Sequence, residues 1–299
     1  MSNVIKKSEI LIDNFIDELW LEKGLSKNTL TAYRRDITTF SEWYRGSSLL
    51  DVDRTDLLDY LSIRLKSGYS GKSTARSLSS LRAFYAHLTN RHNLSQNPTA
   101  RVESPKLGHS LPKTLSEDEV EKLINSPDID DVIGLRDRAM LELLYACGLR
   151  VSELINLDIL NLNLRQGVIR IIGKGNKERL VPMGEQALFW IEEYIEKGRP
   201  NLIKDNKVTE LFLSKRGRSM TRQTFWYRIK DYSVKADIKK DLSPHTLRHA
   251  FATHLINHGA DLRTVQLLLG HSSLSTTQIY TEVARHRMKE LHNEHHPRG

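Results

Sequence analysis

The sequence predicts a mainly α-helical protein that has two domains and one small β-sheet. The chain has 299 residues, and because a domain averages about 150 residues, two domains are expected. Apolar residues recur at helical spacing through most of the chain, whereas β-branched runs typical of strands concentrate around residues 167–182. A stretch with little periodicity follows residue 90 and favours a linker, because it contains Pro98, Pro105, Gly108 and Pro112.

Residues 5–90 form the first predicted domain, a set of four helices. Each helix is indicated by apolar side chains three or four residues apart. The four stripes are Leu11, Phe15 and Leu19; Leu30, Tyr33, Ile37, Phe40 and Tyr44; Leu57, Leu61 and Leu65; and Leu78, Leu81, Tyr85 and Leu88. Basic side chains lie on the opposite faces and either contact nucleic-acid phosphates or form an ordinary solvated surface: Lys27, Arg34, Arg35, Lys72, Arg76 and Arg82.

The second predicted domain, after a linker at residues 91–110, covers residues 111–293 and opens with two helices. Ser116 and Glu119 form a capping box for a helix that ends near Ile124. A helix over residues 134–146 follows, and Gly148 ends it.

A turn and a hairpin then present two candidate site residues. Arg150 lies in the turn between two helices, and Glu153, three residues on, can orient it. Residues 167–172 and 178–182 form a β-hairpin with Lys174 in its turn. Taken alone, the Arg–Glu spacing is a common surface pattern and Lys174 is an ordinary polar turn residue.

The region after the hairpin contains a further strand and a helix with a polar face. Glu210–Ser214 is expected to be a third strand. Thr221 caps a helix over residues 222–230 that could read a DNA major groove, with Arg222, Gln223, Arg228 and Lys230 on its polar side.

Three short helices are predicted between residues 243 and 280. Their boundaries are given by Ser243, Pro244 and Gly259; by Asp261 and Gly270; and by Ser275 with Gln278. The last pair is a capping box, which places Tyr280 one turn inside the third helix.

The polar residues of this region suit phosphate chemistry. His245 and Arg248 are three residues apart and so project from one face of the first turns, where the helix dipole favours an anion. His271 and Tyr280 follow. An arginine, two histidines and a tyrosine near a helix start can hold a phosphate while the phenol attacks it. The alternative is a solvated helix face.

Composition favours a polyanionic partner over a membrane. The formal net charge is +8 and the pI is about 9.4, which favours nucleic acid, although a basic protein without such a partner remains the alternative. Cys147 is the single cysteine and lies in an apolar run, so it is predicted to be a buried hydrophobe in a reducing compartment. Without a signal peptide or long apolar run, a cytoplasmic location is expected.

No metal or other cofactor is predicted. His245 with His249, and His254 with His258, have the spacing of zinc ligands on a helix. The glutamate of the zinc-protease motif and a supporting cysteine cluster are both missing from the sequence. His254 flanks an apolar stripe and is predicted to be structural.

Six positions together resemble the tyrosine recombinases, in their Xer branch. They are Arg150 in GLRVSEL, Lys174 in GKGNKER, His245 and Arg248 in HTLRH, His271 in LGHSS and Tyr280 in TTQIY. The resemblance covers nearly the whole chain. It implies a SAM-like, helical core-binding domain at residues 5–90 and a catalytic domain at residues 111–293 that ends in a docking helix. The two domains would form a clamp on DNA.

The resemblance also implies a role for each residue. Tyr280 would attack a DNA phosphate and form a 3′-phosphotyrosyl intermediate, while Arg150 and Arg248 neutralise the nonbridging oxygens. His245 would act as general base and Lys174 as general acid, and His271 would hydrogen-bond an oxygen. Glu153 would position Arg150 or His245. This chemistry needs no cofactor and no metal.

The implied partners are double-stranded DNA at a dif-like site, a paralogous XerC recombinase in a heterotetramer, and an FtsK-type DNA translocase, with no membrane. The implied process is the resolution of chromosome dimers at cell division. Three alternatives use related residues: a type IB topoisomerase, a phage or integron-type integrase, and a non-enzymatic DNA-binding regulator. The last leaves Lys174, His245 and Tyr280 without a role.

Overall fold

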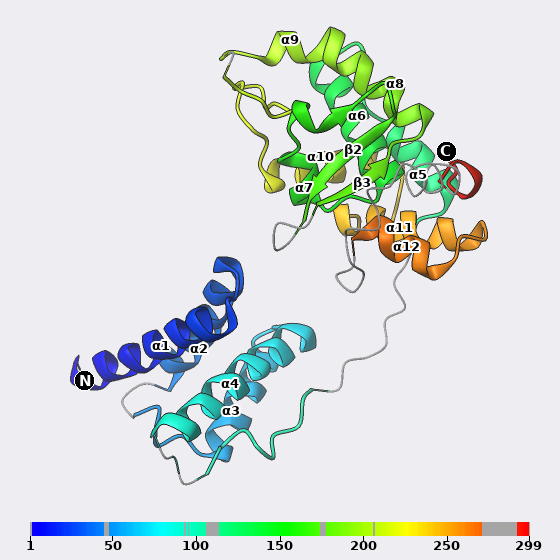
Figure 1. The fold of residues 1–299 in the computed structure, drawn as a ribbon. Coiled ribbons are helices and arrows are strands. Elements are labelled where there is room, and N and C mark those ends of the chain that lie inside the picture. The colour runs from blue at the N-terminus through cyan, green and yellow to red at the C-terminus, as the bar shows by residue number, and fades with distance from the viewer. Residues whose placement is uncertain are drawn as a thin grey trace. The chain divides into compact units, whose positions relative to one another are not determined.

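The computed structural model describes residues 2–44, 48–92, 94, 96–105, 114–173, 178–205, 207–270 and 292–298. The chain divides into two compact units, Met1–Leu111 and Pro112–Gly299. Both are built mainly from α-helices, and the described strands form one small antiparallel sheet in the second unit (Figure 1). The predicted fold class is confirmed. No helix within these ranges is long and apolar enough to cross a bilayer.

The first unit packs four helices around one apolar core. Phe15, Ile37, Leu57 and Leu81 come from four different helices and are all buried in that core. The predicted start of the second helix is confirmed, because the Ser26 hydroxyl accepts a hydrogen bond from the Thr29 amide. The helices are α1 (Ser2–Lys23), α2 (Lys27–Trp43), α3 (Arg54–Lys66) and α4 (Gly71–His92).

The first unit extends beyond the predicted domain end at residue 90. α4 continues to His92, and Val102, farther along, is buried in the four-helix core. Arg82 donates to the Val102 carbonyl oxygen at 2.5 Å and to Ser104 Oγ at 3.1 Å. The first part of the predicted linker therefore belongs to this unit, because a buried valine and an arginine fix it there.

Basic residues of the first unit fall into two groups. Arg34 pairs with Asp13 and Arg76 pairs with Asp36, so these two charges are partly compensated. Arg82 donates to backbone and hydroxyl oxygens, as described above. The second group is Lys27, Arg35 and Lys72, which are exposed; Arg34 and Arg76 are exposed as well, although each lies in an ion pair.

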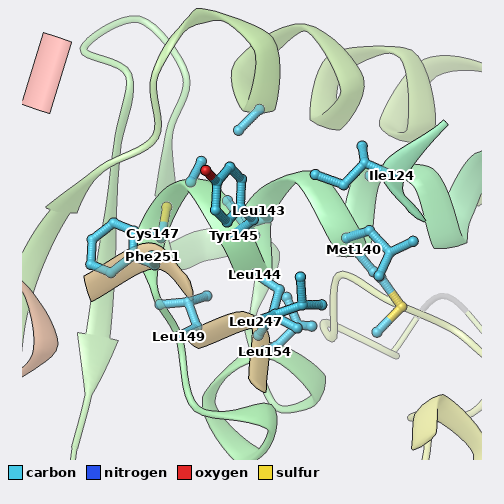
Figure 2. Packing of buried hydrophobic residues seen from close by; sticks show 14 of the residues in the cluster. Ile124, Met140, Leu143, Leu144, Tyr145, Cys147, Leu149, Leu154, Leu247 and Phe251 are labelled. Carbon is cyan, nitrogen blue, oxygen red and sulfur yellow. The ribbon is translucent and has the colours of Figure 1, made fainter. Parts of the chain in front are cut away.

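The second unit is organised around α6 (Val132–Cys147), which is buried along almost its whole length. Figure 2 shows side chains of α6, including Tyr145, among Leu247 and Phe251 of α11 (Pro244–Asn257). Gly148 ends α6 in the left-handed conformation, as predicted. The other α-helices are α5 (Glu117–Ile124), α7 (Val151–Ile155), α8 (Glu185–Glu193), α9 (Arg199–Leu202), α10 (Arg222–Lys235) and α12 (Leu262–Leu269).

The helix starts of this unit follow the predicted caps. Four side chains each accept a hydrogen bond from the amide three residues later, namely those of Ser116, Thr221, Ser243 and Asp261. A π turn, η2 (Tyr194–Gly198), joins α8 to α9. Pro200, just after it, has no N–H with which to continue an α-helical hydrogen-bond ladder.

The sheet has three antiparallel strands in the order β1–β2–β3. They are β1 (Leu162–Asn163), which follows the 3-10 turn η1 (Ile159–Asn161), β2 (Val168–Ile172) and β3 (Glu178–Pro182). β2 and β3 are the predicted hairpin strands, with Arg170 opposite Leu180.

The prediction of a third strand at Glu210–Ser214 is wrong. This segment makes only isolated bridges, from Glu210 to Asp158 and from Leu213 to Ser219. Leu211, Phe212 and Leu213 are all buried, so the apolar run reflects complete burial and not strand pairing. Their amides bond to other groups: Leu211 N donates to Leu157 O at 2.8 Å and Leu213 N to Tyr194 OH at 3.3 Å.

The end of the chain packs against the second unit. His292 is buried, and its Nε2 lies 2.7 Å from the Ala146 carbonyl oxygen at the end of α6. The His296 ring packs against those of Tyr145 and Phe251, with centroids 4.8 and 5.3 Å away. The predicted third helix, with Tyr280, and the docking helix after it fall at residues 271–291, outside the described residues.

Candidate active site

The turn between α6 and α7 presents Arg150. Gly148 has φ 56°, and a Cβ there would lie 2.3 Å from the Phe251 ring, so this close turn requires glycine. Arg150 is the N-cap residue of α7, and its amide donates to Glu153 Oε2 at 2.8 Å. Its side chain is 37% exposed, so the guanidinium is fixed at its base and accessible at its tip.

The helix α11 carries the predicted pair His245 and Arg248. His245 is exposed in the first turn. Arg248 is only 12% exposed, and its guanidinium donates to the carbonyl oxygens of Gly148 at 2.5 Å and Leu269 at 2.7 Å. These bonds tie α11 to the turn that carries Arg150 and to the end of α12.

The Glu153 carboxylate joins the arginines. Its Oε1 accepts from Nη1 of Arg150 and from Nη1 of Arg179, each at 2.9 Å. Its Oε2 accepts from the Arg150 amide and from Arg179 Nη2, each at 2.8 Å, and lies 3.8 Å from Arg248 Nη1. The expected contact between Glu153 and Arg150 is therefore present, and four hydrogen bonds fix the carboxylate.

The cluster keeps a positive charge although it is largely buried. Three guanidinium groups and one carboxylate leave a net charge of +2. Burial raises the pKa of Glu153, but the hydrogen bonds and charge of Arg179, with hydrogen bonds from Arg150, outweigh it and hold that pKa below its usual value. Burial, with the charge of Arg150, lowers the pKa of Arg248 to about 10, so Arg248 stays protonated at neutral pH. Such a cluster suits a phosphate group.

A cavity of about 350 Å³ opens beside Arg150. Its wall is formed by α7, η1 and β2, and Arg170 of β2 donates twice to Asn161 Oδ1, at 3.1 and 2.9 Å. Ser152 and Asn156 also line it. Polar and cationic groups thus line the cavity together with the apolar side chains of Leu157, Ile171 and Ile172.

Half of the six predicted catalytic residues lie in the described part of the chain. The structure brings Arg150 and Arg248 together on Glu153, and His245 precedes Arg248 by one turn of α11. The other three predicted residues lie outside the described ranges, namely Lys174, His271 and Tyr280.

Two of these three follow residues of the site directly along the chain. Lys174 comes after Gly173, which lines the cavity beside Arg150. His271 comes after Gly270, the residue that closes α12 next to Leu269. The first segment therefore starts beside the cavity, and the second starts at the end of α12, which Arg248 contacts.

Arg179 is the residue of the cluster that sequence reasoning missed. It lies in β3 and is buried on the same side of the strand as Val181. Besides its two bonds to Glu153, it donates to the Leu268 carbonyl oxygen at 3.2 Å. A signal was present, since an arginine at an inward-facing strand position requires a buried anionic partner.

The predicted polar face of α10 is only partly available. Arg228 Nε donates to Asp137 Oδ2 at 2.5 Å, and Lys230 pairs with Asp241. The first turn remains exposed, with Arg222 and Gln223. The prediction of a four-residue reading face is therefore wrong for its second half, because buried and neighbouring carboxylates hold those cations.

The residues predicted to be structural have internal partners. His254 is buried between the Tyr145 hydroxyl, 2.8 Å from Nδ1, and the Leu115 carbonyl oxygen, 2.9 Å from Nε2. Cys147 is buried, and burial raises the pKa of its thiol. In the ranges that the structure describes, no group of three or more His, Cys, Asp or Glu residues could hold a metal ion.

Known proteins share this sequence over nearly its whole length. Residues 113–287 match the phage integrase family, and residues 12–92 match the phage integrase N-terminal SAM-like domain. The tyrosine recombinase XerD of Pseudomonas putida is 58% identical over 291 residues, which cover 97% of this chain and 98% of that protein. XerD of Proteus mirabilis is 56% identical, over 98% of this chain and 94% of that protein.

Solved structures agree. The XerH site-specific recombinase, bound to difH substrate in a pre-cleavage complex, matches with a TM-score of 0.65 and 25% identity, over 88% of this chain and 78% of that one. The resemblance stated from the sequence is confirmed. This chain belongs to the phage integrase family, among the tyrosine recombinases of the XerD type, and is an enzyme that cleaves and rejoins DNA.

Proposed function

We propose that this enzyme performs site-specific recombination through attack of the Tyr280 hydroxyl on a DNA phosphodiester. The observation that carries the proposal is the shared contact of Arg150 and Arg248 with one buried carboxylate, which leaves a net positive charge. Two guanidinium groups can neutralise the nonbridging oxygens as charge builds up in the transition state. Arginine suits this better than lysine, because its planar fork donates two hydrogen bonds to one phosphate.

The proton transfers are assigned to residues around the cluster. The bond from phosphorus to the Tyr280 oxygen forms while the bond from phosphorus to the 5′ oxygen breaks. His245 accepts the phenol proton and Lys174 donates a proton to the departing 5′ oxygen, so that charges balance. A free phenol has a pKa of ~10, which makes a base useful at neutral pH. His271 donates a hydrogen bond to a nonbridging oxygen.

The covalent step exchanges one phosphoester bond for another and so conserves the energy of the bond. The product of cleavage is a 3′-phosphotyrosyl ester and a free 5′-hydroxyl, so that the hydroxyl of a partner strand can attack the ester and release Tyr280. Rejoining to a new strand gives recombination without ATP, a cofactor or a metal ion.

The substrate is proposed to be duplex DNA with a dif-like site. The relatives at 56–58% identity are named XerD, and the matching XerH structure contains a difH substrate. We assign the chain to a heterotetramer with a XerC-type paralogue, activated by an FtsK-type translocase, that resolves chromosome dimers at cell division. This role places the protein with the chromosome in the cytoplasm.

The two units divide the work of DNA binding in this proposal. The first unit, Met1–Leu111, is the core-binding domain, with Val102 in its core, and the second unit, Pro112–Gly299, is the catalytic domain with its docking helix. Exposed cations support a DNA-binding role for the first unit, namely Lys27, Arg35 and Lys72. Together the two units would clamp a duplex, with the first turn of α10 offering Arg222 and Gln223 to a groove.

Other functions of this chemistry are less well supported. A phage or integron-type integrase would act on other sites, yet the high identity to XerD proteins spans 97% of the chain. A type IB topoisomerase would relax supercoils as a single subunit. A DNA-binding regulator would not need the buried carboxylate that organises two arginines.

A nicked suicide duplex carrying a dif-like site tests the proposal. Incubation with the protein and its paralogue should give a covalent protein–DNA band on a denaturing gel, and Tyr280→Phe should abolish it while leaving the gel shift intact. Loss of DNA binding in Tyr280→Phe would point to a folding defect of the variant, and Tyr280→Trp would then be compared.

Two other results would contradict the proposal. If the wild-type protein shifts the duplex but forms no covalent band, even with the translocase present, it binds DNA without cutting it. If the band persists in Tyr280→Phe, another residue is the nucleophile.

A further inference from the structure

We propose that Arg179 is a positioning residue for DNA cleavage. It holds Glu153, and through it Arg150, and it also holds the end of α12. The inference rests on the proposed function, because it concerns how the proposed phosphate-binding arginines are kept in place.

Arg179 fixes Glu153 from the interior of the unit. It supplies two of the four hydrogen bonds to that carboxylate, one to each oxygen, and both side chains are 5% exposed. The other two bonds come from Arg150, whose side chain is far more exposed. Pairing of β3 with β2 fixes the backbone of Arg179. Arg179 therefore holds Glu153 in place, and Glu153 in turn positions Arg150.

Arg179 also supports the segment that leads to His271. Its Nε donates to the Leu268 carbonyl oxygen, and Arg248 Nη2 donates to the next carbonyl, that of Leu269. These carbonyls end α12, where free oxygens carry partial negative charge. Gly270 has φ 69°, and a Cβ there would lie 2.9 Å from Arg179 Cδ, so the turn sits directly on the arginine.

Arg179 acts through these neighbours and not on the DNA. All three types of guanidinium nitrogen are engaged, with Nη1 and Nη2 on Glu153 and Nε on Leu268. The side chain is buried and does not line the cavity beside Arg150. Its removal should therefore slow cleavage within the complex and leave DNA affinity unchanged.

The test compares Arg179→Met with a matched control, Arg136→Met. Arg136 is equally buried, donates twice to the carboxylate of Asp137 and once to the Leu213 carbonyl oxygen, and is bonded to none of the arginine cluster. Single-turnover formation of the covalent complex is measured at saturating DNA, together with DNA affinity and thermal unfolding. Misplacing a reacting group by about 1 Å costs about 10²-fold in rate, and a loss near that size is expected for Arg179→Met alone.

A double-mutant cycle tests whether Arg179 acts through Glu153. If Arg179 acts mainly through Glu153, then Arg179→Met should cause little further loss in a Glu153→Gln background. Arg179→Lys, which keeps the charge but not the fork, should recover part of the rate. Cleavage by Arg179→Met should also fall more steeply on mild acidification than wild-type cleavage, because Glu153 loses the hydrogen bonds that hold its pKa down.

The outcomes separate the two proposals. A wild-type protein without a Tyr280-dependent covalent complex overturns the proposed function. A wild-type rate in Arg179→Met or an equal loss in Arg136→Met overturns the role of Arg179, and fully additive losses with Glu153→Gln overturn its action through Glu153. If Arg179→Met does not fold, Arg179→Lys decides: a reduced rate at unchanged DNA affinity supports the role, and a wild-type rate overturns it.

Discussion

The guanidinium of Arg248 donates a hydrogen bond to the carbonyl oxygen of Gly148, 2.5 Å away and 100 residues earlier in the chain. Gly148 ends α6 and precedes the turn that presents Arg150. Arg248 is therefore bonded to the start of the turn that positions Arg150. This bond and the Glu153 carboxylate, which both arginines contact, hold the two guanidinium groups relative to each other.

Arg248→Lys should keep the positive charge but lose the planar, two-donor geometry of the guanidinium. A lysine cannot bond the Gly148 and Leu269 carbonyls and a phosphate at once, because it lacks the planar fork. Removing one donor from a site that stabilises a developing anion costs about 10²–10³-fold in rate. Single-turnover cleavage of a suicide duplex should fall by that order. As a control, Arg263→Lys changes an exposed arginine of α12 and should cleave normally.

Gly148→Ala should destabilise the second unit. Its φ of 56° is left-handed, and the new Cβ would approach the Phe251 ring to 2.3 Å. Strained backbone positions cost about 1–3 kcal/mol, and the clash adds to this. Urea unfolding should show a lower midpoint. Gly259→Ala is the matched control in the same unit, since Gly259 has φ 94° and a Cβ there would approach no described atom closer than 3.8 Å, and the difference between the two variants reports the clash.

Acidification should destabilise the packing of residues 292–298 in the second unit. His292 and His296 are buried, and burial lowers the pKa of both rings; nearby His292 and His254 lower that of His296 further. In the unfolded chain these rings protonate near pH ~6.5. Below that value the unfolded state binds more protons than the folded state, so the free energy of unfolding falls as pH falls.

Chemical unfolding at neutral and mildly acidic pH measures this effect. His296→Phe, which keeps a ring beside Tyr145 and Phe251, should reduce the pH dependence of the unfolding midpoint. An identical pH dependence in the variant would show that His296 protonates equally well in the folded chain.

DNA binding should weaken steeply with salt. The first unit exposes Lys27, Arg35 and Lys72, and each phosphate contact releases a counterion. The logarithm of the association constant should fall linearly with the logarithm of salt concentration. Lys72→Ala should lower that slope by about 1 if Lys72 contacts a phosphate. A slope close to zero for the wild-type protein would contradict the clamp.

Local physics explains which elements could be predicted from the chain. Capping depends on residues three apart, so Ser116, Thr221, Ser243 and Asp261 mark helix starts whatever their surroundings. Helical periodicity likewise determined the four stripes of the first unit. The apolar run at residues 211–213 misled because burial on every side looks the same as a strand in sequence.

The candidate site likewise has residues that the sequence predicted and contacts that only the structure shows. The sequence by itself predicted that Arg150, His245 and Arg248 belong to one site, since their types and order are those of a family motif, and the structure brings Arg150 and Arg248 to one carboxylate. Only the tertiary structure decided that Arg179 joins them and that Arg228 does not. A charged side chain takes the buried partner that folding brings to it, Glu153 for Arg179 and Asp137 for Arg228, and those partners lie 26 and 91 residues away in the chain. No local pattern encodes such pairings.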